Sequence, residues 1–396
     1  MSSLDLETIQ KYAPLVRLFP HPHDSAHDVG ADLRVGPYVV GADRRIGPYA
    51  NVVADRRIGP NVPHNLVGPY NPCSVDDYLA RVQLVTPGCP PQSPVTAAHL
   101  ANAGSDTHLQ IADDPGACSP VRAGNFNPSA GIDAPVYVHL RRVPHRANQF
   151  DIQYWFFYAV RGRSTGYLRA GFDYYFDLLG PTADQPRHPK RRPHGRYQGD
   201  RYDRPYTHGY QGPGEHQGDW KHVTVRVDAW SEMLGVYYAQ HDSGFWVDRD
   251  DVPLHAGTRP IVYSARNTHS CYPAAGKFFQ QRSLTFRLPG LGLAGMGLLE
   301  WMADGGQLWD CARPGGLQIV ADDIDNSSSR PAWLDYPGYW GPVVKQRLDP
   351  ATFARPNLAM SLPSGVRNLL ARRGQRVLDT LVTGARSPAM QSAWHA

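Results

Sequence analysis

The chain has 396 residues, enough for one large all-β domain or two smaller domains with a sizeable core. Its 38 glycines and 36 prolines exceed the average share of the two residues, about 12%, which favours short strands and long loops and argues against a helical bundle. The net charge of +4 is too small for a dedicated nucleic-acid-binding protein.

The cysteines and the hydropathy of the chain bear on its compartment. No two of the five cysteines form a Cys-x-x-Cys pair, the first nine residues lack the apolar region of a secretory signal, and no stretch reaches the ~20 apolar residues of a membrane span. We therefore expect a reducing, cytoplasmic location and no transmembrane segment. A disulfide between two of Cys73, Cys89 and Cys118 is one alternative that their spacing allows. The longest apolar stretch, 288–299, is expected to be a buried loop or short helix.

The N-terminal part combines an expected strand with an unusual repeat. Residues 11–19 are predicted to form the first strand. A motif with one apolar residue before Gly-Pro then recurs three times in residues 31–61, within an insertion that we place at 31–70. Stacked hairpins would explain the repeat, and so would a duplicated surface loop without a function. A short helix is expected to begin after Ser74, which has the residue type of an N-cap.

Strands dominate the middle of the chain. Residues 136–140 and 151–158 alternate like paired strands, and nearly every residue of 152–158 is apolar, which indicates a strand buried on both faces. Residues 180–213 read as a long polar loop with a basic run at 187–194. That run could contact an anionic surface or could simply be solvated.

The most informative segment is Gly214 to His222, which contains two histidines and two carboxylates and continues into a strand. Further strands are predicted at 219–227, 233–241 and 260–264. The C-terminal part is expected to form a short helix at about 294–303, an aromatic turn at 333–341 that packs over the sandwich, and a helix over 364–383 within a C-terminal helix and tail at 364–396.

Strand alternation divides this segment between two faces. Asp219 and Lys221 share one face with the valines that follow them, whereas Trp220, His222, Thr224 and Arg226 share the other. If the protein is an enzyme, the candidate catalytic residues are His216, Asp219, His222 and His241. The candidate ligand-binding residues are Trp220, Tyr154, Trp246 and His269. A structural alternative is that these histidines only satisfy buried polar groups and loops.

Several segments resemble one family. They are Tyr12-Ala13-Pro14-Leu15-Val16, Pro72-Cys73-Ser74-Val75, the strand at 153–158, the segment at 214–220, and Val262-Tyr263-Ser264 through His269 to Tyr272-Pro273. In order and spacing they resemble the vacuolar protein sorting-associated protein 62 family. That family's name suggests a trafficking role, which no residue supports by itself.

The segment at 214–221 also resembles, more weakly, the Gly-His-x-His-Asp-Trp-Glu motif of necrosis- and ethylene-inducing-like proteins. The resemblance implies a β-sandwich, a divalent cation and sphingolipid binding. His216 and Asp219 match the metal-binding His and Asp of that motif, while Gly218 and Lys221 replace its second His and its Glu.

A metal site would use oxygen-rich ligands and select Ca²⁺ or Mg²⁺. The candidate ligands are His216, Asp219, Glu215 and Asp173, with Asp177 as a further carboxylate. The Lys221 ammonium opposes such a site, because it can form an internal ion pair with Asp219 where the cation would lie. We therefore expect weak or absent metal binding.

Together these observations predict a single mainly antiparallel β-sandwich domain over residues 1–396, with long loop insertions and a C-terminal helix. We expect a site rich in His, Asp and Glu at its rim that binds a lipid head group, a glycan or another small molecule; the aromatic residues Trp246, Tyr206 and Tyr210 favour this. The alternative is an enzyme that uses the His/Asp cluster for acid/base or metal-assisted chemistry on an ester or a biosynthetic intermediate. The oligomeric state stays open.

Overall fold

The computed structural model describes residues 4–18, 71–112, 124–127, 131–146, 148–162, 216–240, 243–279, 300–302, 306–325, 330–343 and 385–395, together with helical positions 364–365, 368–369 and 372. For 165–169, 173–177, 284–288 and 292–299, and for residues 277, 279, 301 and 395, it describes the backbone only. The fold is mainly β, as the sequence predicts, and the expected strands at 136–140, 152–158, 219–227, 233–241 and 260–264 are all present.

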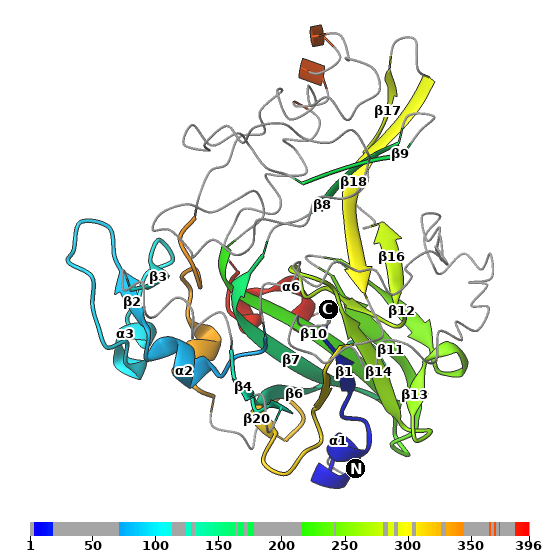
Figure 1. Cartoon of the computed structure of the whole chain (residues 1–396). Helices are drawn as coiled ribbons and strands as arrows, with labels where there is room; N and C mark the ends of the chain where they lie inside the picture. The colour runs from blue at the N-terminus through cyan, green and yellow to red at the C-terminus, as the bar shows by residue number, and fades with distance from the viewer. Residues whose placement is uncertain are drawn as a thin grey trace.

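Two sheets pack face to face (Figure 1). The six-stranded central sheet has the order β12 (Gly244–Asp248), β11 (Met233–Ala239), β10 (His216–Asp228), β7 (Gln149–Arg161), β6 (Val136–Arg142) and β20 (Leu317–Asp322). The second sheet has the order β13 (Leu254–His255), β14 (Arg259–Ser264), β1 (Leu15–Arg17) and β19 (Leu308–Asp310), with β15 (Cys271–Tyr272) against β14. Neighbouring strands are antiparallel, except that β1 pairs with β14 and β6 with β20 in parallel.

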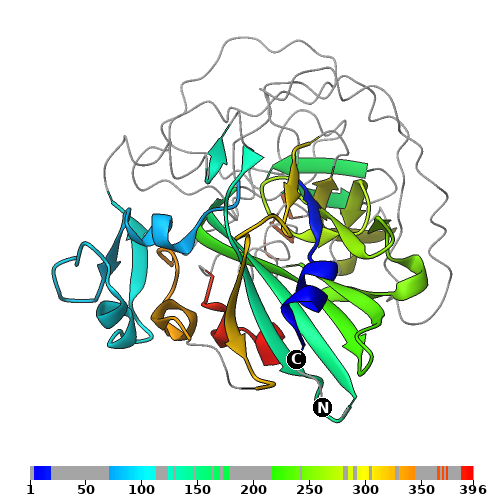
Figure 2. The ribbon, with the colours of Figure 1, turned by 90° about the horizontal axis from the view of Figure 1, so that it is seen from below.

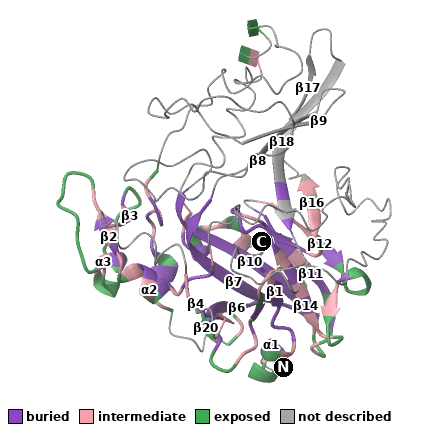
Figure 3. Cartoon of the chain, in the orientation of Figure 1, coloured by how far each residue is buried: buried purple, intermediate pink, exposed green. Residues whose placement is uncertain are grey.

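The core between the two sheets follows from strand alternation. On β10, Val223, Val225 and Val227 point toward the second sheet and join a cluster that includes Tyr154 of β7 and Val262 of β14. The other face of β7 is also covered, so every residue from 150 to 161 is buried, as predicted for this strand (Figure 3).

An aromatic cluster covers one end of the outer face of the central sheet. Trp220 of β10 stacks with Trp333 and meets Trp340 edge-on, which confirms that the turn at 333–341 packs over the sandwich. The cover is built from α2 (Val75–Leu79), η2 (Ala332–Asp335), η4 (Pro388–Met390) and α6 (Ser392–His395). Ser74 caps α2 as predicted, because its side chain accepts hydrogen bonds from two backbone N–H groups of the first turn.

A third sheet extends away from the sandwich (Figure 1). It has the order β16 (Gly276–Phe279), β18 (Gly292–Met302), β8 (Thr165–Arg169) and β9 (Asp173–Asp177), with β17 (Leu284–Leu288) also paired with β18. The prediction of a helix at 294–303 is wrong, and so is the prediction of a buried loop or short helix at 288–299. Its glycines disfavour a helix, and β18 pairs with strands on both of its sides.

The N-terminal strand is shorter than predicted, because helix α1 (Leu6–Lys11) comes first and β1 begins at Leu15. The Asp5 side chain caps α1, and Tyr154 donates a hydrogen bond to the Ile9 carbonyl, which holds α1 against the sandwich (Figure 2). The remaining short elements are α3 (Ala97–Ala101), β2 (Val82–Val85), β3 (His108–Ile111), β4 (Phe126–Asn127), β5 (Gly131–Ile132) and η1 (Arg249–Asp251).

Several predicted features lie outside the described residues. They are the insertion at 31–70 with its repeat, the loop at 180–213 with its basic run, and most of the helix predicted at 364–383. Cys73, Cys89, Cys271 and Cys311 are free thiols, whereas Cys118 is outside the described part. Of the helices that the structure describes, none has the length and apolar character needed to span a membrane.

Candidate functional site

Asp219 and Lys221 form a buried ion pair on the inner face of β10. The Lys221 Nζ lies 2.5 Å from Asp219 Oδ1, and both side chains are at most 3% exposed. The other oxygen, Asp219 Oδ2, lies 3.0 Å from His269 Nδ1. The His269 ring stacks on Tyr158 with 3.8 Å between centroids. Both carboxylate oxygens of Asp219 are therefore engaged by neighbouring side chains, and the ion pair that the sequence suggested is present.

The histidines around this pair are uncharged near neutral pH. Burial lowers the pKa of His216 and of His269 to about 4 in each case. His216 Nδ1 lies 2.9 Å from the Gly218 carbonyl oxygen, to which it donates a hydrogen bond. Burial alone would raise the pKa of Asp219, but Lys221 and His269 hold it well below its usual range. A carboxylate, an ammonium and neutral imidazoles thus coexist in a closed environment.

A divalent cation fits Asp219 poorly. Lys221 contacts one of its oxygens and His269 the other, and His216 turns its Nδ1 toward backbone carbonyls. Within the described ranges no group of three or more His, Cys, Asp or Glu side chains could hold a metal ion. Glu215 and the side chain of Asp173 lie outside the described residues, as does that of Asp177. The metal site therefore stays a prediction, to which the contacts of Asp219 add no support.

Gly218 allows the chain at 340–341 to approach this segment closely. Its φ is +63°, and a Cβ atom there would lie 2.5 Å from both the Cβ and the carbonyl oxygen of Trp340. Gly218→Ala should therefore lower the free energy of unfolding by about 3 kcal/mol, measured by urea denaturation. Gly257→Ala is the matched control, because Gly257 has φ +77° with nothing within 4 Å, so only about 1–2 kcal/mol of backbone strain is expected. An equal loss of unfolding free energy in the two variants would mean that Trp340 can move aside without destabilising the fold.

A second buried titratable group lies next to the ion pair and was missed from the sequence. Glu300, at the end of β18, is 1% exposed and accepts a hydrogen bond from the Thr268 hydroxyl. Burial raises the pKa of its carboxyl to about 7. Arg161, at the end of β7, is fully buried and interacts electrostatically with both Glu300 and Asp219. An arginine directly after the apolar run at 154–160 is the sequence signal that could have pointed to this cluster.

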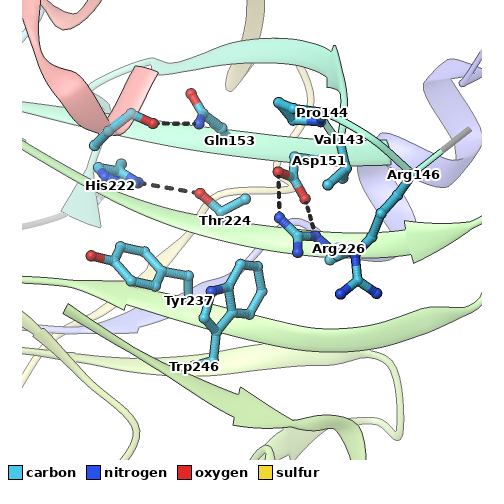
Figure 4. A pocket seen from close by; sticks show the side chains of 11 residues that line it. Val143, Pro144, Arg146, Asp151, Gln153, His222, Thr224, Arg226, Tyr237 and Trp246 are labelled. Atoms are coloured by element: carbon cyan, nitrogen blue, oxygen red, sulfur yellow. Dashed lines mark hydrogen bonds and ion pairs between the residues drawn. The ribbon is translucent and has the colours of Figure 1, made fainter. Parts of the chain in front are cut away.

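A pocket with a volume of about 410 Å³ opens on the outer face of the central sheet, beyond the aromatic cover (Figure 4). Strand register builds it: Trp246, Tyr237, Thr224 and Gln153 lie opposite one another on β12, β11, β10 and β7. Trp246 is 36% exposed, and its ring lies 5.6 Å from that of Tyr237. The pocket thus has an aromatic wall on β11 and β12 and a polar floor on β10 and β7.

Arginines form the other end of this pocket. Arg226 makes a two-point ion pair with Asp151, with Nε–Oδ1 at 2.7 Å and Nη2–Oδ2 at 2.9 Å. Arg141 Nη2 lies 3.3 Å from the same carboxylate. The Arg226 guanidinium also lies 4.4 Å from the Trp246 ring centroid. The exposed Arg146, from the turn between β6 and β7, completes this end of the lining.

His222 lines the pocket at the end away from the arginines (Figure 4). Its ring lies between Trp155 and Tyr237, at centroid distances of 4.3 and 5.8 Å, and its Nδ1 lies 3.3 Å from Thr224 Oγ1. Burial, followed by the positive charges of Lys221 and Arg141, lowers the pKa of His222 to about 3. The ring is therefore a neutral hydrogen-bonding group near pH 7.

The structure separates the predicted site residues into two groups. His216, Asp219 and His269 lie in the buried inner cluster, whereas His222 and Trp246 line the outer pocket, because successive residues of a strand face opposite sides of the sheet. Trp220 and Tyr154 are core residues at 3% and 0% exposure. His241, Tyr206 and Tyr210 lie outside the described residues.

Sequence reasoning missed the arginines and Asp151 as pocket residues. The signal was present, because alternation on β10 places His222, Thr224 and Arg226 on one face as polar neighbours of Trp220. When one face of a strand is apolar and the other carries a row of polar residues, the polar face is the one that is exposed to solvent.

The comparisons with known proteins bear on the family. No curated protein and no solved structure matches the chain. The model of the vacuolar protein sorting-associated protein 62 family matches residues 209–395, which include β10, β11, β12, β14, β19 and β20. The resemblance found in the sequence is thereby confirmed over residues 209–395, the part of the chain that is similar to the vacuolar protein sorting-associated protein 62 family.

Proposed function

We propose that this protein binds a small polar molecule, such as a sugar or a lipid head group, in the pocket on the outer face of the central sheet. The observation that carries the proposal is the open pocket of about 410 Å³, which combines an aromatic wall with hydrogen-bonding groups and guanidinium groups. Ligand sites in proteins typically have volumes of about 300–1,000 Å³ and a few well-placed polar groups.

The floor of the pocket is held in place before any ligand binds. Gln153 Oε1 accepts hydrogen bonds from Trp155 Nε1 at 3.1 Å and from His139 Nδ1 at 3.0 Å, while Gln153 Nε2 donates to the Ala393 carbonyl at 2.9 Å. A floor that is already ordered reduces the conformational entropy lost on binding, so more of the contact energy appears as affinity.

The contacts of the candidate catalytic residues favour binding over catalysis. His222 lines the pocket, but Asp219 lies on the opposite face of β10, so the two side chains cannot act on one molecule there. With its pKa lowered to about 3 by burial, His222 is poorly matched to general acid/base work near pH 7. The four free thiols support a reducing compartment, and we propose the cytoplasm on that basis.

Replacing Trp246 with Ala should weaken binding by about tenfold or more, because the ligand loses the aromatic wall. Isothermal titration calorimetry would measure this with glucose, glucose 6-phosphate, glucuronate, glucosamine, glycerol phosphate and phosphocholine as probes. Trp230→Ala is the matched control, since Trp230 is 82% exposed at the turn between β10 and β11 and away from the pocket lining.

Two results would contradict the proposal. One is that no probe binds at millimolar concentration. The other is that Trp246→Ala and Trp230→Ala have the same effect on a probe that does bind, which would place the binding site elsewhere.

A further inference from the structure

We infer that the pocket is selective for an anion: its ligand is a small ring that carries a carboxylate, phosphate or sulfate group. This inference rests on the proposed function and names the class of ligand. It comes from the distribution of charge around Asp151 and from the position of the aromatic wall.

The charges at the arginine end do not cancel. Arg226 and Arg141 both pair with the single carboxylate of Asp151, at 2.7 and 3.3 Å. Asp151 is 1% exposed, so this cluster is screened by solvent only on the side of the pocket. Arg141 is not part of the pocket lining and also interacts electrostatically with Asp323, so it is left out of the charge count. Among the described residues that line the pocket, Arg226 and Arg146 are cationic and Asp151 is the only carboxylate, which leaves one positive charge that a bound anion would neutralise.

Arg146 supplies the positive charge that Asp151 does not offset. Backbone hydrogen bonds from Arg146 N to the Val143 carbonyl and from Gln149 N to the Arg146 carbonyl, both 3.1 Å, fix its turn. Among the residues that the structure describes, no carboxylate forms an ion pair with Arg146. Asp248, two residues along β12 from Trp246, is exposed and is not part of the pocket lining.

Arg226 and Arg146 lie at the end of the pocket away from His222 (Figure 4). A guanidinium group presents paired N–H donors that match the oxygens of a carboxylate, phosphate or sulfate. Trp246 lies between the two ends and Tyr237 lies beside His222, and both can offer ring faces to an apolar or sugar ring. One molecule can satisfy both features only if it carries its anionic group on a ring.

The test is calorimetry with probes that share a ring and differ in charge. Glucose 6-phosphate and glucuronate are anionic, glucose is neutral and glucosamine is cationic. The anionic probes should bind at least about tenfold more tightly than glucose, glucosamine should bind most weakly, and only the preference for anions should weaken as NaCl is raised.

Arg146→Gln should remove most of that preference while leaving the affinity for glucose unchanged. Arg146 is exposed, so the variant is expected to fold. Arg142→Gln is the matched control, because Arg142 is also exposed but lies over the Phe150 ring, which belongs to the core on the other side of the sheet.

The outcomes separate this inference from the proposed function. Binding of glucose equal to or tighter than that of the anionic probes would overturn the inference and leave the proposed function standing. An anion preference that Arg142→Gln and Arg146→Gln reduce equally would also overturn it, because a general surface effect would then be responsible. If none of the probes binds, the inference and the proposed function both fail.

Discussion

Lowering the pH from 7 to 4 is expected to unfold the protein cooperatively, because three buried histidines must remain uncharged in the folded state. Burial lowers the pKa of His222 to about 3 and those of His216 and His269 to about 4, whereas an unfolded histidine titrates near about 6.5. Below pH 6.5 the unfolded chain therefore binds up to three protons that the folded chain does not, and stability falls as the pH falls.

Glu300 acts in the opposite direction. Burial raises the pKa of its carboxyl to about 7, so between its ordinary pKa of about 4.3 and pH 7 the folded state holds a proton that the unfolded state has released. Its contribution to stability therefore increases as the pH falls through this window. Three histidines against one carboxyl leave a net loss of about 3 kcal/mol per pH unit near pH 5. Typical unfolding free energies are about 5–15 kcal/mol.

Urea denaturation at half-unit pH intervals from 7 to 4 would measure this dependence. His222→Gln should reduce the slope by about 1.4 kcal/mol per pH unit, the contribution of one proton. His255→Gln is the control, because His255 is exposed on β13 and its replacement should leave the slope unchanged. A slope near zero between pH 6 and 4 would contradict the burial of neutral histidines.

Lys221→Met is expected to destabilise the fold by about 3–5 kcal/mol, the usual effect of leaving a buried charge without its partner. The variant removes the ammonium 2.5 Å from Asp219 Oδ1 and leaves a carboxylate that is 3% exposed. The double variant Asp219→Asn/Lys221→Met should recover much of the loss, because it removes both charges and keeps an amide that can hydrogen-bond His269. Urea denaturation midpoints at pH 7 would measure both effects.

The chain provides its own control for this experiment. Lys11 lies 3.5 Å from Glu232, and these side chains are 37% and 50% exposed. Lys11→Met should therefore cost at most about 1 kcal/mol, since solvent screens an exposed ion pair. If Lys221→Met lowered the free energy of unfolding no more than Lys11→Met does, the Asp219–Lys221 pair would have to be hydrated.

The sequence predicted the strands of the sandwich because alternation is a local property. The segment at 152–158, apolar at every position except Gln153, becomes the middle of β7, and the valines at 223, 225 and 227 face the core. The segment at 294–303, for which the sequence predicts a short helix, is instead part of a strand. Only its pairing with strands on both sides, which no local pattern reveals, makes it β18.

The candidate site was only partly predictable. The adjacency of Asp219 and Lys221 follows from their spacing on one strand, and so does the separation of His222 from them. The pocket depends on strand order: Trp246, Tyr237 and Thr224 meet because β12, β11 and β10 are neighbours in a particular register. The ion-pair partner of Arg226 likewise comes from another strand: Asp151 lies on β7, 75 residues earlier in the chain.

The position of β1 has a consequence for the order in which the protein is made. β1 lies between β14 and β19, and Leu15 pairs with Ile261 on one side and with Asp310 on the other. A ribosome therefore releases the first strand long before either neighbour exists, and its backbone N–H and C=O groups must stay unpaired meanwhile. Contacts so distant along the chain slow folding and leave edges open to aggregation. The second sheet can close only after most of the polypeptide has been translated.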